Sequence, residues 1–318
     1  MSFKIIGTGK YIPDYSVDNN MISQYVETSD EWIKQRVGIA SRYISTKYTT
    51  NEMGAFAAKD AMEQCGVTAD EIDLIIASTC SSEYACPTVA GFVQKEIGAD
   101  CPVFDINSAC SGFLFCLETA AMYMNSGKYK KVLVVGSERI SRLLDWGDRS
   151  TCVIFGDGAG AAVLEAEDGH YLASKLFTKG DTEIIEIPLD IGNSPFYKGE
   201  AKKPAIKMLG QETFKFAVNS IVNDCLEVLD AAGLSVKDVD HFVPHQANSR
   251  IINYAAKRLG VPEEKFVSII SEYGNTSSSS VPMALDVLNR SGKLKRGDIV
   301  VMSAFGGGLS SAACVIKW

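Results

Sequence analysis

Short apolar segments alternate with helical patterns along the whole chain. Segments 74–76, 132–135 and 299–302 are uninterrupted apolar runs. Such runs are typical of strands buried on both faces of a parallel sheet, whereas apolar residues three to four positions apart indicate amphipathic helices. The order helix, strand, helix, strand occurs twice, and no linker rich in glycine, serine or proline interrupts it. The pattern therefore predicts an α/β protein with stacked layers of helices and sheets.

An internal repeat accounts for this double order. Residues 66–76 and 233–243 each begin with glycine, continue with a Thr-x-x-Glu or Ser-x-x-Asp cap signal, and end in an apolar strand. Further matches, at the same spacing or two residues shorter, pair 131–137 with 298–304 and 126–128 with 291–293. Chance similarity of such simple patterns is the alternative to duplication. We expect two related halves, residues 1–170 and 171–318.

Composition and net charge exclude some classes of function. The 318 residues are 46% hydrophobic and 22% charged, which permits a sizeable core, and the net charge of −8 argues against nucleic acid as the main partner. No secretory signal begins the chain, and no run approaches the roughly 20 apolar residues that span a membrane. The nine cysteines are scattered without a C-x-x-C pair. We expect a cytoplasmic protein whose cysteines stay reduced and hold no metal.

Cys110 is the candidate nucleophile because it lies beside the start of a predicted helix. A turn of small residues precedes it, and apolar residues follow with helical spacing at Phe113, Cys116, Leu117 and Ala120. The unpaired N–H groups and the dipole at a helix amino terminus lower a cysteine pKa from about 8.5 to roughly 3.5–7.5. We therefore expect a lowered pKa at Cys110.

The three histidines differ in context. His170 follows a surface-turn signal, and His241 alternates with apolar residues inside a predicted strand. His245 ends that strand and begins a helical segment, which makes it the candidate for chemistry. His241 and His245 are four residues apart on a strand that contains Pro244, so they form no shared ligand face. A zinc site is therefore not expected. A purely structural role remains the alternative for His245.

Two polar or glycine-rich turns complete the candidate chemistry. Asn275 lies in the polar turn 272–280. Stabilising the conformation of this turn is the alternative to a catalytic role. The glycines 306–308 follow the predicted strand 299–303 and suit an oxyanion pocket of backbone N–H groups. Segment 156–160 is not a dinucleotide fingerprint, since its last glycine is one residue early and a strand follows.

These segments together resemble the signatures of the β-ketoacyl-acyl-carrier-protein synthase III family. The matching motifs are Ser108-Ala-Cys-Ser-Gly-Phe113, Val243-Pro-His-Gln-Ala-Asn-Ser-Arg250, Tyr273-Gly-Asn-Thr-Ser277 and Phe305-Gly-Gly-Gly308. Segments 28–36 and 148–160 extend the match, and the order agrees from about residue 4 to Trp318. The resemblance implies a thiolase-like fold of five layers, α-β-α-β-α, assembled as a homodimer that binds no cofactor, coenzyme A being part of a substrate.

The resemblance also implies a ping-pong acyl transfer that starts fatty-acid synthesis. Cys110 takes the acyl group of an acyl-coenzyme A primer, which divides one difficult transfer into two. Malonyl-acyl-carrier-protein then loses carbon dioxide, and the enolate attacks the acyl-cysteine to give 3-oxoacyl-acyl-carrier-protein. His245 and Asn275 donate hydrogen bonds to the malonyl thioester oxygen, while the N–H groups of Cys110 and Gly307 hold the other oxyanion.

The identity of the third catalytic residue separates the relatives of this family. Thiolases carry a second cysteine and elongating synthases a second histidine, whereas Asn275 fits initiating synthases. A Cys-His-Asn condensing enzyme of secondary metabolism, of polyketide or quinolone type, is the nearest alternative. A Cys-His hydrolase and a non-catalytic acyl-binding protein are more distant ones.

The remaining expected site residues are implied by the same resemblance. Those for coenzyme A and its pantetheine arm are Thr28, Trp32, Arg36, Arg149, Gly210, Phe214, Ala247 and Asn248. Those for docking the acyl carrier protein are Lys215, Gln246, Arg250, Lys257 and Arg258, and those for the acyl pocket are Cys86 and Phe155. A capping box with Glu31 is the alternative for Thr28, and solvated helix charges are the alternative for the basic patch.

The primer is expected to extend beyond acetyl. Cys86 stands where acetyl-preferring members often carry phenylalanine, in a loop that reaches across the dimer interface. A smaller side chain deepens the pocket, and each buried methylene contributes about 0.8 kcal/mol. We expect four- to six-carbon or branched primers to be accepted alongside acetyl.

Overall fold

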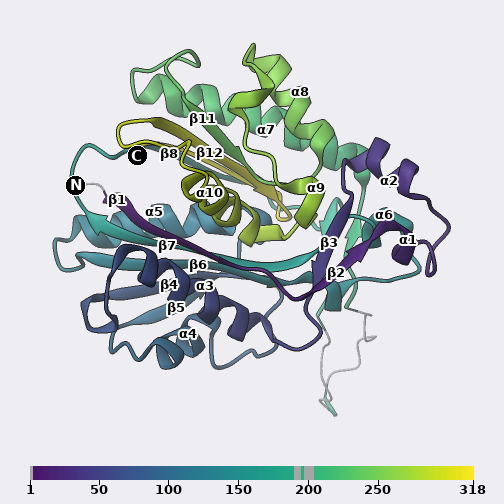
Figure 1. Cartoon of the computed structure of the whole chain (residues 1–318), viewed down its shortest axis with the longest axis horizontal. Coiled ribbons are helices and arrows are strands. Elements are labelled where there is room, and N and C mark those ends of the chain that lie inside the picture. The colour runs from purple at the N-terminus through teal and green to yellow at the C-terminus, as the bar shows by residue number, and fades with distance from the viewer. Residues whose placement is uncertain (1–2, 190–194, 197–203) are drawn as a thin grey trace.

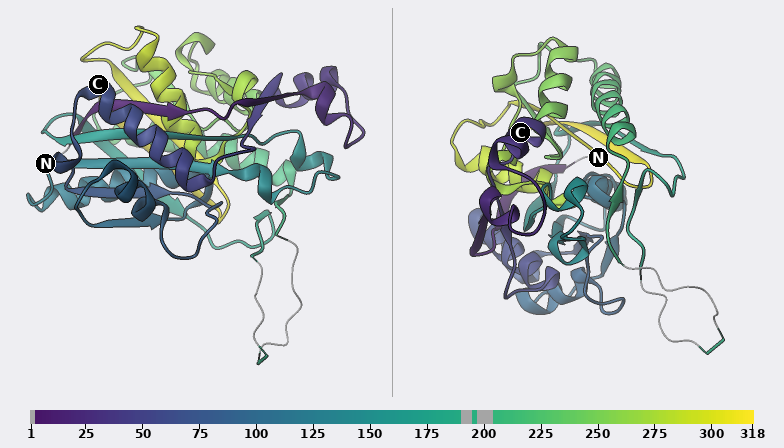
Figure 2. Two further views of the ribbon diagram at one scale, coloured as in Figure 1. Left: turned by 60° about the horizontal axis from the view of Figure 1, so that its bottom comes forward. Right: turned by 90° about the vertical axis from the view of Figure 1, so that its right-hand side faces the viewer.

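Two β-sheets lie face to face, separated by helices and covered by helices on their outer faces (Figure 1). The computed structural model describes residues 3–189, 195–196 and 204–318. Helices α5 (Gly112–Asn125) and α10 (Ser280–Arg290) pack between the sheets. Helices α3 (Thr50–Cys65) and α4 (Val89–Ile97) cover one outer face, and α7 (Gly210–Ala231) and α8 (Ser249–Leu259) cover the other (Figure 2). The predicted five-layer α-β-α-β-α fold is confirmed.

The first sheet has five strands in the order β1-β7-β6-β4-β5. Strand β4 pairs in parallel with β5 and β6, whereas β7 runs antiparallel to β1 and β6. Its strands are β1 (Phe3–Tyr11), β4 (Leu74–Ser78), β5 (Val103–Ile106), β6 (Lys131–Arg139) and β7 (Asp157–Ala166). The apolar runs in β4 and β6 are buried on both faces, as the sequence predicts.

The second sheet has four strands in the order β11-β12-β13-β8, with β11 parallel to β12 and β13 antiparallel to both of its neighbours. Its strands are β8 (Tyr171–Thr178), β11 (His241–Pro244), β12 (Ile299–Gly306) and β13 (Ser310–Lys317). Strand β12 is longer than the predicted 299–303 because Gly306 still pairs with Ser310 of β13.

The two sheets correspond strand by strand. In each, a parallel pair (β4 with β6, β11 with β12) is followed by an antiparallel strand (β7, β13) and then by the strand that comes first along the chain (β1, β8). Both predicted cap signals form, since the Thr68 N–H donates to Glu71 at 2.9 Å and the Ser235 N–H to Asp238 at 2.8 Å. The predicted division after residue 170 falls just before β8 and stays a prediction.

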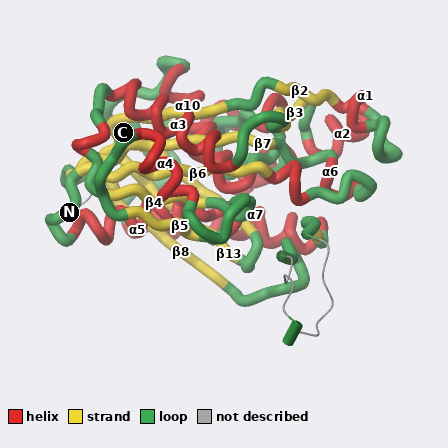
Figure 3. The backbone as a smooth tube through the Cα atoms, turned by 90° about the horizontal axis from the view of Figure 1, so that it is seen from below, coloured by secondary structure: helices red, strands yellow, loops and turns green. Residues whose placement is uncertain are grey.

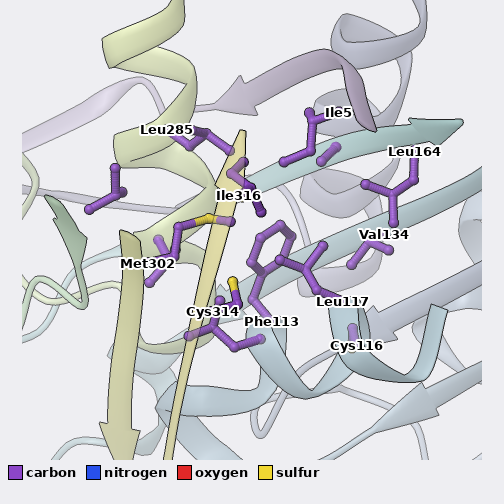
Figure 4. Close-up of a cluster of buried hydrophobic side chains, with 14 of the residues drawn as sticks. Ile5, Phe113, Cys116, Leu117, Val134, Leu164, Leu285, Met302, Cys314 and Ile316 are labelled. Atoms are coloured by element: carbon purple, nitrogen blue, oxygen red, sulfur yellow. The ribbon is translucent and has the colours of Figure 1, made fainter. Parts of the chain in front are cut away.

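The main core lies between the sheets and fixes the positions of both central helices (Figure 4). Phe113 and Leu117 of α5 pack with Met302 and Cys314 of the second sheet. On the other side, α10 approaches β7 so closely that a Cβ on Gly160 would lie 2.7 Å from the backbone nitrogen of Met283. This contact explains the glycine at position 160, within strand β7.

Smaller elements lie at one end of the two sheets, and several of them are labelled in Figure 3. They are β2 (Tyr15–Asp18), β3 (Ser41–Ile44), β9 (Ile185–Glu186), β10 (Lys207–Met208), α1 (Asn19–Ile22), α2 (Asp30–Val37), α6 (Arg149–Cys152) and α9 (Ile270–Tyr273). The buried Arg42 of β3 binds this region together, donating to Asn19 at 2.8 Å and to the carbonyl of Val153 at 2.7 Å. Within the described part of the chain, no helix has the length and apolarity needed to cross a membrane.

Candidate active site

Cys110 is held between the start of α5 and the end of β12. It occupies a 3-10 turn, Ala109–Ser111, that leads directly into α5, as the sequence predicts. Ala109 has a φ of 46°, a left-handed conformation that is costly for a residue with a side chain and is typical of functional sites. A Cβ on Gly306 would lie 2.7 Å from the Cys110 nitrogen, so only glycine permits β12 to end here.

His245 is fixed as a neutral hydrogen-bond donor. It follows β11, is 1% exposed, and its ring meets Phe305 edge to face at 5.3 Å. Burial lowers the pKa of His245 to about 3, so the imidazole is uncharged at neutral pH. Its Nδ1 lies 2.6 Å from Ser280 Oγ, which also accepts the Gln246 N–H at 3.2 Å. When the Ser280 hydroxyl donates to Nδ1, Nε2 carries the ring proton.

Asn275 is positioned by its backbone and its own side-chain oxygen. Its N–H donates to the carbonyl of Ile154 at 3.0 Å, and its carbonyl accepts the Gly156 N–H at 3.0 Å. Its Oδ1 accepts the Ser277 N–H at 2.8 Å, so Nδ2 is the side-chain group available to donate. The turn role weighed for Asn275 is thus present alongside its place in the site.

One cavity of about 180 Å³ brings the three candidate residues together. Cys110, His245 and Asn275 all line it. Five further predicted residues also line it: Phe155, Gly210, Phe214, Ala247 and Asn248. Gly306, one of the glycines expected to form an oxyanion pocket, lines it as well. The remaining lining residues were not predicted as site residues: Ser150, Ile154, Ile185, Met208, Thr213, Ile251 and Phe305.

The predicted pKa of Cys110 is wrong in direction. Burial raises the pKa of the Cys110 thiol to about 12, and the charge of Glu138 adds to this, although a hydrogen bond from Ser277 lowers it. The helix amino terminus acts the other way, but the thiol is enclosed by β12 and by the loop after Asn275. In the resting site the sulfur is therefore a thiol, and the reaction must remove its proton.

The expected coenzyme residues lie at and beyond the cavity mouth. Arg36 and Arg250 border a second, more open cavity of about 450 Å³ that shares Gly210, Phe214 and Asn248 with the first. The Arg149 guanidinium stacks directly on Trp32, 4.8 Å from its ring centroid. A planar ring could enter between them only if they separate.

Thr28 does not have the helix-capping role that was its alternative. The N-cap of α2 is Ser29, whose hydroxyl accepts the Trp32 N–H at 3.1 Å, so the capping box of Thr28 with Glu31 is wrong. Among the described residues, the buried Thr28 Oγ1 has no hydrogen-bond partner. A buried hydroxyl without a partner is costly, which supports a ligand contact at Thr28.

Most of the predicted carrier-protein surface is exposed, with one exception. Lys215 on α7, and Arg250, Lys257 and Arg258 on α8, are all exposed. Gln246 is fully buried, and its amide donates to the carbonyls of Pro244 and Val267 and accepts the Ile269 N–H. The docking role predicted for Gln246 is therefore wrong, because its side chain instead holds the loop that follows His245.

Two further expectations stay predictions. Gly306 lines the cavity beside Cys110, whereas Gly307 lies against Ile185 and is not among the residues that line the cavity. Cys86 is exposed and does not line the cavity of its own chain, so a role in the acyl pocket would require a partner subunit. Across residues 3–189, 195–196 and 204–318, no cluster of three or more His, Cys, Asp or Glu side chains could hold a metal ion.

Several polar residues of the site escaped the sequence patterns. Ser277 Oγ lies 3.4 Å from Cys110 Sγ, and the buried Glu138 at the end of β6 lies beside Ser277. Ser280 orients His245, and the buried Thr213 Oγ1 faces the cavity with no partner among the described residues. The available signals were a charged residue ending an apolar strand and four consecutive serines after Asn275.

Comparison with known proteins gives concordant results for sequence and structure. Family models described as 3-oxoacyl-[acyl-carrier-protein (ACP)] synthase III and its C-terminal part match residues 104–180 and 229–318. The β-ketoacyl-[acyl-carrier-protein] synthase III of Clostridium acetobutylicum is 45% identical, the alignment covering 100% of this chain and 99% of the relative.

Two solved structures show the same fold. The 3-oxoacyl-[acyl-carrier-protein] synthase III of Aquifex aeolicus superposes with a TM-score of 0.94 at 41% identity, covering 100% of both chains. A priming β-ketosynthase from a polyketide biosynthetic pathway superposes with a TM-score of 0.93 at 37% identity, covering 99% of this chain and 96% of the other.

Proposed function

The chain belongs to the 3-oxoacyl-[acyl-carrier-protein] synthase III family, and on that premise we propose that the cavity around Cys110 condenses an acyl-coenzyme A primer with malonyl-acyl-carrier-protein. The reaction releases carbon dioxide and yields 3-oxoacyl-acyl-carrier-protein, the step that initiates fatty-acid synthesis. The protein is thus an acyltransferase of the condensing class.

Cys110 receives the acyl group in the first half-reaction. Its sulfur attacks the thioester carbonyl of the primer, and coenzyme A leaves with the proton that the thiol gives up. The backbone N–H groups of Cys110 and Gly307 would stabilise the oxyanion, and the close approach of Gly306 to Cys110 supports this proposal. This assignment rests on the position of Cys110 in the lining of a largely apolar cavity.

His245 and Asn275 act in the second half-reaction. Decarboxylation leaves an enolate whose oxygen bears the developing negative charge. Nε2–H of His245 and Nδ2 of Asn275 are the two donors whose partners orient them for that oxygen. Because the buried His245 is already neutral, it donates a hydrogen bond without any change in the protonation of its ring. Removing one such donor typically lowers the rate about 10²–10³-fold.

The substrate arm extends from the cavity to the exposed mouth. Phe214, Ala247 and Asn248 line its path, and Arg36 and Arg250 border the mouth, where phosphates would lie. Thr28, Trp32 and Arg149 form the outer adenine site. The unpartnered hydroxyls of Thr28 and Thr213 support hydrogen bonds to the bound substrate.

Membership of the family also supports a proposal for the oligomeric state and the cellular compartment. We propose a homodimer in the cytoplasm that exchanges substrates with an acyl carrier protein and needs no further cofactor. Edge strand β5 carries Phe104, whose ring packs 5.6 Å from the half-exposed Tyr123 of α5, and Met122 beside it is 55% exposed. This apolar edge supports a subunit contact. All nine cysteines are free, as suits a reducing compartment.

The single observation that carries the proposal is the convergence of Cys110, His245 and Asn275 on one cavity. The direct test is intact-mass spectrometry after exposure to acetyl-, butyryl- and isobutyryl-coenzyme A, followed by malonyl-carrier-protein. We expect one acyl group on Cys110, then carbon dioxide and 3-oxoacyl-carrier-protein. Release of free acid without a new carbon–carbon bond would instead indicate a hydrolase.

Secondary metabolism is the less favoured setting. The polyketide priming ketosynthase is 37% identical, below the 45% of the fatty-acid-type relative. Preference for malonyl-carrier-protein from fatty-acid synthesis over a polyketide carrier would separate the two.

A further inference from the structure

A buried carboxylate lies behind the nucleophile and has no part in the mechanism derived above. Glu138 is the penultimate residue of β6 and is fully buried. Its oxygens accept hydrogen bonds from five groups besides Ser277: Thr79 Oγ1 at 3.1 Å, the Cys80 N–H at 3.2 Å, the Cys80 thiol at 3.5 Å, Ser81 Oγ at 2.5 Å and Ser278 Oγ at 2.7 Å. So many donors hold an anion in place, while burial pulls its pKa upward.

Ser277 connects this carboxylate to the reacting sulfur. Its Oγ lies 3.1 Å from Glu138 Oε1 and 3.4 Å from Cys110 Sγ. Ser277 has a φ of 52°, and Ala109, which precedes the nucleophile, has a φ of 46°. They are the only non-glycine residues with positive φ within the described part of the chain. Strained backbone thus occurs at the two places that bring the sulfur and the hydroxyl together.

The Ser277 hydroxyl has one hydrogen and two possible acceptors. When it donates to Glu138, its lone pair is free to accept the Cys110 S–H; when it donates to Cys110, it stabilises a thiolate. The three side chains therefore form a continuous path along which one proton can shift by two short steps.

We propose that Ser277 and Glu138 form a proton relay that deprotonates Cys110 during acylation and reprotonates the departing coenzyme A. The relay rests on the proposed function and adds a step to it. The Cys110 S–H bond breaks as its proton passes to Ser277 Oγ, whose own proton passes to Glu138. Sulfur bonds to the acyl carbon, the carbon–sulfur bond to coenzyme A breaks, and the proton returns through Ser277 to the leaving sulfur. No other reactant is consumed.

Electrostatics favour this route over His245. The buried imidazole is a weak base, with its pKa lowered to about 3, and its Nδ1 is engaged by Ser280. Ionised Glu138 opposes a second nearby anion and so contributes to the raised pKa of Cys110. In the relay, the single negative charge moves from Glu138 to the sulfur, so two anions never coexist in the buried site.

The dependence of the acylation rate on pH distinguishes the relay from a purely structural role for Glu138. Besides Cys110, the titratable groups that face the relay are Cys80, whose sulfur lies 3.5 Å from Glu138, and His245 across the cavity. Burial raises the pKa of Cys80 well above its usual value and lowers that of His245, so neither titrates between about pH 6 and about pH 9. With the relay, the proton stays within the site, and the acylation rate is flat over this range.

The test is the single-turnover rate of Cys110 acylation by acetyl-coenzyme A as a function of pH. Glu138→Gln keeps the shape of the side chain but cannot accept the proton, so the proton must leave to solvent. We expect acylation about 10²-fold slower at neutral pH, rising about tenfold per pH unit. Ser277→Ala should give the same slope. Glu138→Asp, which retains a carboxylate, should restore a flat profile.

Ser278→Ala is the matched control, since it removes a 2.7 Å bond to the same carboxylate while leaving Ser277 in place. We expect its profile to stay flat whatever its rate. If Glu138→Gln does not fold, Ser277→Ala decides by the same slope. Flat profiles in Glu138→Gln and Ser277→Ala, or faster acylation after the charge is removed, would overturn the relay. A wild-type protein that forms no acyl-Cys110 would overturn the proposed function instead.

Discussion

At the scale of single residues, burial sets the charge state of the site. It raises the pKa of Cys110 to about 12 and lowers that of His245 to about 3, so both groups are neutral at neutral pH. Neither group carries charge at rest, and negative charge develops during the reaction, first on the sulfur and later on the enolate oxygen. Fixed donors are most effective for such charges in a site that excludes water.

Ser280 is expected to control which nitrogen of His245 donates. Without its hydroxyl, Nδ1 can carry the ring proton, and Nε2 no longer donates to the malonyl thioester. For Ser280→Ala we expect decarboxylation to slow about 10- to 100-fold, with acylation of Cys110 changed little. Carbon dioxide release and acyl uptake, measured separately, check this. Ser279→Ala, which removes a hydroxyl bonded to the Thr276 carbonyl, should leave both rates intact; equal loss in both variants would contradict the assignment.

The buried His245 also makes folding stability depend on pH. Unfolded, its pKa is 6.5; folded, it is about 3. Between these values the unfolded chain binds a proton that the folded protein does not, so stability falls as pH drops below 6.5, by about 1.4 kcal/mol per pH unit. Urea unfolding of His245→Gln should therefore converge toward the wild type on acidification. A difference between the two proteins that stays constant with pH would refute the argument.

At the scale of elements, the sequence predicted where the catalytic groups lie but not what encloses them. Strand ends and a helix start located Cys110 and His245, because these follow from local periodicity. Ser277 and Glu138 are 139 positions apart, and no local pattern links them. The wrong pKa direction for Cys110 has the same cause, since its enclosing walls come from β12 and the loop after Asn275. The five layers were predictable from family resemblance and the repeat.

The packing of α10 on β7 is expected to be intolerant of even a methyl group. A Cβ on Gly160 would meet the backbone nitrogen of Met283 at 2.7 Å, and backbone cannot move aside cheaply. Gly160→Ala should therefore lower the free energy of unfolding by about 1–3 kcal/mol. Because α10 carries Ser280, decarboxylation should decline as well. Gly180→Ala, where an added Cβ has nothing within 4 Å, is the control; equal stability of the two variants would contradict the close approach.

At the scale of the whole molecule, charge and architecture place the two substrates. The net charge is −8, yet Arg36 of α2 and Arg250 of α8 border the mouth of the cavity. The further exposed cations Lys215, Lys257 and Arg258 lie on α7 and α8. An acidic carrier protein would be repelled by most of the surface and attracted here, which guides its phosphopantetheine arm toward Cys110. The expected five-residue docking set is reduced to four by the burial of Gln246.

Reversing two of these charges should weaken the binding of the carrier-linked substrate alone. Lys257 and Arg258 lie on the exposed face of α8, away from the lining of either cavity. For Lys257→Glu combined with Arg258→Glu, we expect the KM for malonyl-carrier-protein to rise about tenfold, because like charges now oppose docking. The KM for acyl-coenzyme A should change little. Added salt should shrink the effect, since exposed charges are screened beyond about 10 Å at 0.1 M ionic strength. Lys95→Glu, on exposed α4 of the opposite outer layer, should leave both values unchanged. An equal rise in KM for both substrates, or an effect insensitive to salt, would show that α8 is not the docking surface.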